Sequence, residues 1–363
     1  MAWLFLLAYW IVALVVVSLA YALWNRGLTG GLAIVGTESA EGSPVEDLPE
    51  RILGSGPKVP VFEGDRIEVT LRIESPRGTR GPARISASIG TAQLSTAAGL
   101  VRKEGWEEVQ VVGPVRRGRV DARGMSLERG DPLGFFKHHG PRVESELGLV
   151  LPRFTALAAR PHVRELEASA AAPRAGSGTE MFGVREYRPG DPLRRIHWRS
   201  SARHGELIVR EFEPPGVQTL GIFCDPSPPT PDAADQIARL AASEAWDCLR
   251  TGGRVVLWAP GAEPSAPSES RSLWALLEWL ARYPGPHPAG SQGEQADLPT
   301  RWGGQAPRVS DAIAVLATAN FEIDDALETI RLRGGAVRAW VVGDAKMDSA
   351  VSTQRAGLAW PLP

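Results

Sequence analysis

The chain has 363 residues, which is too many for one simple core and predicts two or three domains. Its formal net charge of −2 excludes a polycation that binds nucleic acid with its whole surface. The two cysteines, Cys224 and Cys248, have neither metal-binding nor redox spacing, which argues against a disulfide framework and fits a reducing compartment.

Residues 2–24 carry no charged side chain and have tyrosine and tryptophan near both ends. About 20 apolar residues span a bilayer as a helix, and these aromatic residues suit its two interfaces. A cleaved signal peptide is the alternative, but the segment lacks a positive start and a small-residue cleavage site. We therefore predict a single-pass membrane anchor over residues 1–27. Arg26 follows the span and favours a cytoplasmic body by the positive-inside rule.

The next part of the chain predicts a tether and then an all-β domain. Residues 28–57 contain Gly, Ser and Pro and are expected to be a tether. Apolar residues then alternate strictly in residues 67–73, which is typical of a half-buried strand, and shorter alternations follow. Short strands separated by Gly/Pro turns predict a β-sandwich over residues 58–157.

The C-terminal part, residues 216–363, alternates strand patterns with helical patterns. Expected strands lie at residues 218–224, 254–259, 312–317 and 336–342, and expected helices at residues 231–251, 273–280 and 323–330. Such alternation predicts a parallel α/β (Rossmann-like) sheet covered on both faces.

Between these domains, residues 158–215 form a linker followed by an arginine-rich segment. Residues 185–213 hold seven arginines and no lysine, with acidic residues among them. Arginine pairs bidentately with carboxylate or phosphate, so the composition indicates a defined geometry. Either an ionic network fixes this segment against a neighbouring domain, or the segment is a binding surface for a partner's acidic groups or a phosphate. Locally we expect a helix over residues 193–203 with Ile196 and Trp198 turned inward.

Residues 178–203, GTEMFGVREYRPGDPLRRIHWRSSAR, resemble the signature of the bacterial family called domain of unknown function 58. Shorter matches lie upstream, among them FEGD at 62–65 and DPLGFF at 131–136. The resemblance marks as binding or interdomain residues the set Glu180, Arg185, Glu186, Tyr187, Gly190, Asp191, Arg194, Trp198, Ser201 and Arg203.

The resemblance implies a bacterial membrane protein, often encoded beside MoxR-type AAA+ ATPases, with a von Willebrand factor A-like domain after the signature. In that fold a metal site begins with D-x-S-x-S at the end of the first strand. Here Asp225 and Ser227 match, but Pro229 replaces the second serine. Thr318 could add a hydroxyl, and Mg²⁺ is the ion that such oxygen ligands suit. The alternative is that Asp225 only caps a helix or turns the chain.

These features predict a non-enzymatic, membrane-anchored scaffold or adaptor that works with a MoxR-type AAA+ ATPase and binds no nucleic acid. Two alternatives stay open. One is a metal-dependent hydrolase that uses Asp225 together with arginine anion clamps. The other is an extracytoplasmic module that binds an envelope polymer.

Overall fold

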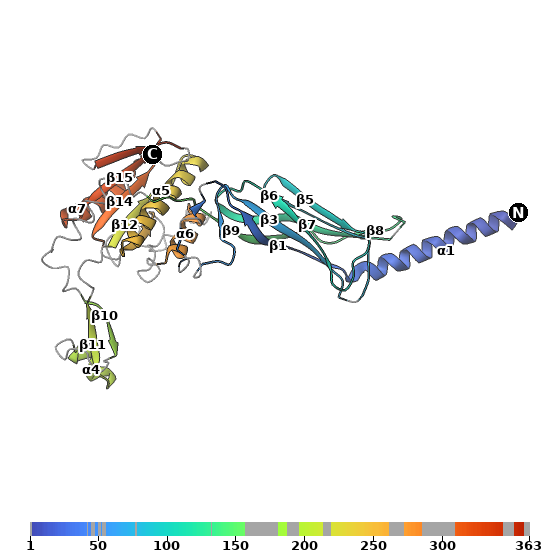
Figure 1. Ribbon diagram of the computed structural model, residues 1–363, viewed down its shortest axis with the longest axis horizontal. Coiled ribbons are helices and arrows are strands. Elements are labelled where there is room, and N and C mark those ends of the chain that lie inside the picture. The colour runs from blue at the N-terminus through green and yellow to red at the C-terminus, as the bar shows by residue number, and fades with distance from the viewer. Residues whose placement is uncertain are drawn as a thin grey trace, which may run out of the picture. The chain divides into compact units, whose positions relative to one another are not determined.

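The computed structural model describes residues 2–41, 43–44, 48–49, 52, 56–76, 78–131, 133–156, 181–186, 196–212, 219–260, 272–284, 309–343 and 352–358. These residues form two compact units, which are described separately (Figure 1). The first unit comprises Met1–Arg153 with Leu277–Tyr283, and the second comprises Phe154–Leu276 with Pro284–Pro363.

The first unit begins with α1 (Ala2–Trp24), which continues into the short 3₁₀-helix η1 (Asn25–Gly27). The segment Trp3–Gly27 has 25 residues, and an 18-residue stretch within it has a mean hydropathy of 2.5. At about 1.5 Å per residue it extends about 37 Å, which exceeds the hydrocarbon thickness of about 30 Å. α1 is therefore long and apolar enough to cross a membrane, although a secretory signal sequence passes the same test.

Polar side chains join the end of α1 to the β-domain that follows. The buried Asn25 amide donates to the carbonyls of Gly81 at 2.7 Å and Gly130 at 2.6 Å, and it accepts from the Gly81 N–H at 3.0 Å. The Arg80 guanidinium donates to the Trp24 carbonyl at 2.6 Å, which satisfies one of the unpaired carbonyls at the helix end. The direction of α1 is thus fixed relative to this end of the β-domain.

The β-domain consists of two sheets. The three-stranded sheet has the antiparallel order β1 (Thr29–Glu38), β3 (Arg66–Glu74), β6 (Trp106–Val112). The larger sheet has the order β2 (Val61–Phe62), β9 (Val143–Leu151), β7 (Gly118–Gly130), β4 (Ala83–Ile89), β5 (Ala92–Ala98), and β8 (Lys137–His139) pairs with β7.

One hydrophobic core lies between the two sheets. The alternating residues of β3 (Ile67, Val69, Leu71, Ile73) are fully buried and pack in one cluster with Ile85 and Leu94 of the other sheet. The strict alternation in residues 67–73 therefore placed one face of β3 on the core, as expected.

Side-chain hydrogen bonds close one side of this core. Trp106 of β6 donates to the Thr96 hydroxyl of β5 at 3.2 Å, and Thr96 in turn donates to Glu108. Gln110 reaches the Ser95 carbonyl at 2.9 Å. The sheets consequently curl around the core as a half-barrel. Elsewhere in this unit Arg117 donates to the backbone carbonyls of Leu280 and Tyr283, which belong to the same unit.

The expected tether over residues 28–57 is wrong for its first part. Residues 29–38 form β1 and pair with β3 from Thr29↔Glu74 to Glu38↔Arg66. Glycines obscured the strand pattern, yet Leu32 and Ile34 pack against the core. At Gly30 an added Cβ would come within 2.9 Å of Ile85 Cδ1, so glycine lets this strand approach the opposite sheet closely.

The second unit contains a five-stranded parallel sheet and confirms the expected alternation of strands and helices. Its order is β13 (Arg254–Trp258), β12 (Thr219–Cys224), β14 (Asp311–Leu316), β15 (Val337–Val342), β16 (Ser352–Ala356). The helices are α5 (Pro231–Arg250), α6 (Leu273–Arg282) and α7 (Phe321–Leu332). When these strands are numbered 1 to 5 along the chain, their order across the sheet is 2-1-3-4-5. The chain connections that follow β12 and β14 therefore run in opposite directions across the sheet.

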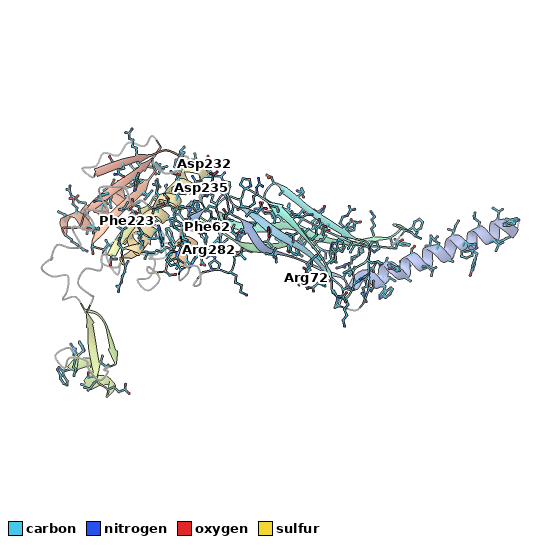
Figure 2. The ribbon with its side chains drawn as sticks, in the orientation of Figure 1. Phe62, Arg72, Phe223, Asp232, Asp235 and Arg282 are labelled. Carbon is cyan, nitrogen blue, oxygen red and sulfur yellow. The ribbon has the colours of Figure 1, made fainter. Side chains whose placement is uncertain are left out.

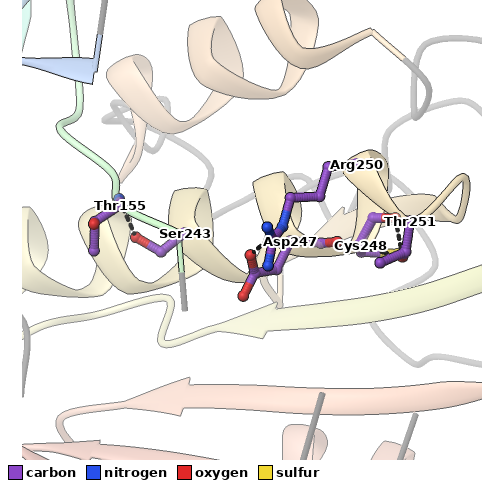
Figure 3. Close-up of polar contacts among 6 residues, drawn as sticks. All are labelled: Thr155, Ser243, Asp247, Cys248, Arg250 and Thr251. Carbon is purple, nitrogen blue, oxygen red and sulfur yellow. Dashed lines mark hydrogen bonds and ion pairs between the residues drawn. The ribbon is translucent and has the colours of Figure 1, made fainter. Parts of the chain in front are cut away.

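The buried helix α5 is held by polar contacts on several sides (Figure 3). Ser243 accepts from the Thr155 N–H at 3.1 Å, and Glu244 accepts from the Trp340 indole at 2.8 Å. Cys248 contacts the Arg254 carbonyl at 3.4 Å, and burial raises the pKa of this thiol to about 12. Neither cysteine forms a disulfide, and Cys248 remains a protonated thiol at neutral pH.

Candidate functional site

The first candidate site lies at the carboxyl edge of the parallel sheet, between β12 and β14. Asp225 follows β12 and is fully buried, and its backbone N–H donates to the Val315 carbonyl at 3.1 Å. In open α/β folds the usual ligand crevice lies at the carboxyl ends of the two adjacent strands between which the strand order reverses. Asp225 therefore lies where open α/β folds commonly bind a ligand.

The Asp225 carboxylate accepts four hydrogen bonds. Its Oδ2 accepts from the N–H of Ala317 at 3.1 Å, the N–H of Thr318 at 2.7 Å and the Thr318 hydroxyl at 2.6 Å. Its Oδ1 accepts from the Ser227 N–H at 2.9 Å. Each donor replaces a hydrogen bond that the buried carboxylate would otherwise make to water. Asp225 thus ties the loop after β12 to the loop after β14.

These contacts leave the Mg²⁺ site expected from Asp225 and Ser227 a prediction. Three donors already occupy Oδ2, the oxygen nearest Thr318. Ser227 is exposed, whereas Asp225 is fully buried. The hydrogen bonds also suit the alternative, in which Asp225 fixes the turn of the chain.

Asn320 completes this edge of the sheet. Its side-chain oxygen accepts from the N–H groups of Glu322 at 3.0 Å and Ile323 at 3.1 Å, so it caps the start of α7. Asp225, Ser227 and Thr318 were predicted site residues, whereas the cap at Asn320 was not predicted. An asparagine just before an apolar helical pattern was the available signal.

The second candidate site is the signature module, which we define as residues 181–186 and 196–212. It contains β10 (Met181–Glu186), α4 (Trp198–His204) and β11 (Ile208–Phe212), and the two strands pair antiparallel. Figure 1 shows them as a small hairpin with α4 at its tip.

Ser201 holds α4 against β11. Its hydroxyl accepts from the Ile208 N–H at 2.9 Å and donates to the His197 carbonyl at 3.2 Å. The His197 N–H in turn donates to the Ile208 carbonyl at 2.7 Å. Gly205, at φ +74°, ends the helix, and its N–H donates to the Ser201 carbonyl at 3.0 Å. The backbone of the module is therefore fixed by a small hydrogen-bond network.

The expected inward orientation is correct for Ile196 and wrong for Trp198. Ile196 is buried, whereas Trp198 is 66% exposed. The helix begins at Trp198 and not at Leu193. Ile196 therefore precedes the helix and lies in an isolated β-bridge. Leu207, between α4 and β11, is also exposed, at 44%. The module thus presents two large apolar side chains on a backbone fixed by Ser201.

Several residues marked by the resemblance lie outside the described residues, namely Glu180, Tyr187, Gly190, Asp191 and Arg194. Arg185 and Glu186 lie in β10 and Arg203 lies in α4, but only their backbones are described. The arginine network between domains consequently stays a prediction.

Comparison with known proteins supports the resemblance for the second half of the chain. Residues 183–328 match the model of a family described as "Protein of unknown function DUF58". This range starts in β10 and ends in α7, so it includes both candidate sites. A segment of 80 residues is 32% identical to the uncharacterized protein YeaD of Bacillus subtilis (strain 168). That alignment covers 22% of this chain and 20% of the relative, so most of the relative's length lies outside the match.

Proposed function

We propose that this protein is a non-enzymatic, membrane-anchored adaptor whose signature module binds a protein partner. The observation that carries the proposal is the 66% exposure of Trp198 on a module whose backbone Ser201 fixes. Tryptophan is enriched among the residues that dominate protein interfaces, because one side chain buries about 150–250 Å². A fixed backbone lowers the entropy lost when such a surface binds.

A MoxR-type AAA+ ATPase is the partner class that we propose, from the resemblance of residues 178–203. Such a partner acts in the cytoplasm, and Arg26, which follows α1, favours a cytoplasmic body. The membrane anchor is α1. Its last residues are bound to the β-domain through Asn25 and Arg80, and this attachment supports an anchor over a cleaved signal sequence.

We further propose that the α/β unit is von Willebrand factor A-like and that its Asp225 site has a structural role. The parallel sheet and the Asp-x-Ser sequence directly after β12 support that assignment. The hydrolase alternative has less support, because four hydrogen-bond donors already occupy the Asp225 carboxylate.

Photocrosslinking tests the binding surface in the cells that make this protein. A photoreactive phenylalanine would replace Trp198, and a matched variant would carry it at Phe321, an aromatic residue of α7 that is 78% exposed. We expect a crosslinked AAA+ ATPase at position 198 and none at position 321. Equal crosslinking at both positions, or an ATPase crosslinked only at position 321, would contradict the proposal.

A further inference from the structure

One residue of α1 is covered, although most of the helix is exposed. Ser18 is 2% exposed and lies beside the carboxylate of Asp131, which directly follows β7. α1 and β7 are in contact, both within the first unit. Ser18 precedes Trp24 by six residues, which is about 9 Å along the helix. The loop Gly130–Phe136 therefore reaches back along α1 from its junction with the β-domain.

The length of α1 sets the depth of this loop in a membrane. A span needs about 20 residues, and the apolar segment is Trp3–Gly27. Every window of about 20 residues within that segment includes Ser18. Even in the window nearest the N-terminus, which ends at residue 22, Ser18 lies about 6 Å inside the hydrocarbon boundary. A loop that covers Ser18 consequently enters the membrane wherever α1 is placed.

The loop carries exposed apolar side chains, as a loop that enters a membrane requires. Leu133 and Phe135 are each 59% exposed, although both are large and apolar. Its one acidic residue, Asp131, is buried and accepts from the N–H of Phe136 at 2.6 Å and of Leu133 at 3.0 Å. A carboxylate with these partners costs less to remove from water than an unpaired one.

The same end of the β-domain carries further exposed apolar residues. The pairings Ile73↔Trp106 and Met125↔Val143 place Trp106 and Val143 at the end where β1 starts, directly after α1. Leu100, beside the bridge Arg80↔Val101, is exposed there too. Figure 1 shows β8 at this end, and Figure 2 labels Arg72 there. Exposed apolar patches of this kind mark interaction surfaces.

Charged side chains of both signs surround these apolar residues. The cations Arg102, Lys103, Lys137 and Arg142 are exposed at the same strand ends, and so are the acidic residues Glu104 and Glu144. Long basic side chains can place their charge among phosphates while their stems cover apolar surface. Lys137 pairs with Glu128 at 3.3 Å, so these two side chains add no net charge at this end.

We propose that the loop Gly130–Phe136 inserts Leu133 and Phe135 into the lipid bilayer beside α1, as a second membrane contact of the β-domain. This inference rests on the proposal that α1 spans a membrane. The occupant of the surface is the boundary between lipid headgroups and acyl chains. The contact holds the β-domain against the membrane and limits its rotation about α1.

Depth-dependent fluorescence quenching tests this proposal on the full chain in vesicles of phosphatidylcholine and phosphatidylglycerol. An environment-sensitive dye is attached to Leu133→Cys or Phe135→Cys. Matched variants carry it at Val12→Cys in α1 and at Val35→Cys in β1, both exposed positions. The native Cys224 is buried and the Cys248 thiol has a pKa of about 12, so labelling selects the introduced cysteine.

Lipids with a nitroxide near the headgroup should quench most of the emission at positions 133 and 135, and little at position 35. Lipids with a nitroxide at mid-chain should quench position 12. Quenching at 133 and 135 no greater than at 35, with position 12 quenched, would overturn the loop proposal and leave the anchor intact. Absence of quenching at position 12 would refute the anchor and, with it, this inference.

Discussion

Substitution of Asp225 tests whether this residue fixes two loops or binds a metal. Asp225→Ala removes the acceptor of four donors, from Ser227, Ala317 and Thr318. An unsatisfied buried donor costs about 1–3 kcal/mol, but water can replace the carboxylate for the donors that are partly exposed. The Ala317 N–H is the fully buried one. We therefore expect a loss of about 2–4 kcal/mol in the free energy of unfolding of the α/β unit.

Asp225→Asn should be milder. Its amide oxygen can take the place of Oδ2 and keep three donors, while its NH₂ group then faces the Ser227 N–H. We expect a loss of about 1–2 kcal/mol from this one broken contact. The control is Ser227→Ala, which retains the backbone N–H that donates to Asp225 and should leave stability within about 0.5 kcal/mol of the wild type.

Denaturant titration of the full chain in detergent, with hydrogen exchange of the Thr318 amide, measures these changes. The exchange rate of Thr318 should rise in Asp225→Ala and stay near the wild-type rate in Ser227→Ala. The reasoning would be refuted if Mg²⁺ stabilised the wild type, and if Asp225→Ala and Ser227→Ala both abolished that stabilisation. That result would show an ion bound by both residues.

Three further predictions follow from contacts elsewhere. Ser201→Ala leaves the buried Ile208 N–H without its acceptor, so this amide should exchange faster, by the equivalent of about 1–3 kcal/mol, while exchange in the β-domain stays unchanged. Asn25→Ala removes three of the hydrogen bonds that join the end of α1 to the β-domain, so protease should cut after α1 faster than in the wild type; an unchanged rate would contradict the attachment. Burial raises the pKa of Cys248 to about 12, so a thiol reagent at pH 8 should leave this side chain unmodified until the chain unfolds. The protonated thiol also contributes to the stability of the folded state at pH values below its unfolded pKa of about 9. That contribution is lost as the pH rises toward 12.

The sequence correctly predicted the strands and helices whose apolar pattern is visible within a few consecutive residues. Residues 67–73 alternate without interruption, and their strand and its buried face were found correctly. β1 was missed because Gly30, Gly31 and Gly36 interrupt its pattern and resemble a linker. β16 was missed because Ser352–Ala356 is mostly polar, and its residues at 353–355 are exposed.

The geometry of both candidate sites depends on contacts that a local pattern does not contain. Asp225 and Thr318 lie 93 positions apart, and only the strand order that makes β12 and β14 neighbours brings them together. The exposure of Trp198 follows from where α4 begins, and helix ends are the least predictable part of a helix from sequence. Ser201 was identified through the family resemblance, but its bond to Ile208 became visible only in the hairpin.

Binding of the purified partner to Trp198→Ala is the most direct test of the adaptor proposal. The full chain in nanodiscs is titrated with the MoxR-type ATPase, and the Phe321→Ala variant serves as the matched control. A central tryptophan is worth about 2–4 kcal/mol in an interface, so we expect Kd to rise at least about 30-fold for Trp198→Ala. The control should bind like the wild type, and the Tm of both variants should be unchanged, since both side chains are exposed. Wild-type affinity in Trp198→Ala, or a Tm that falls in step with its affinity, would contradict the account.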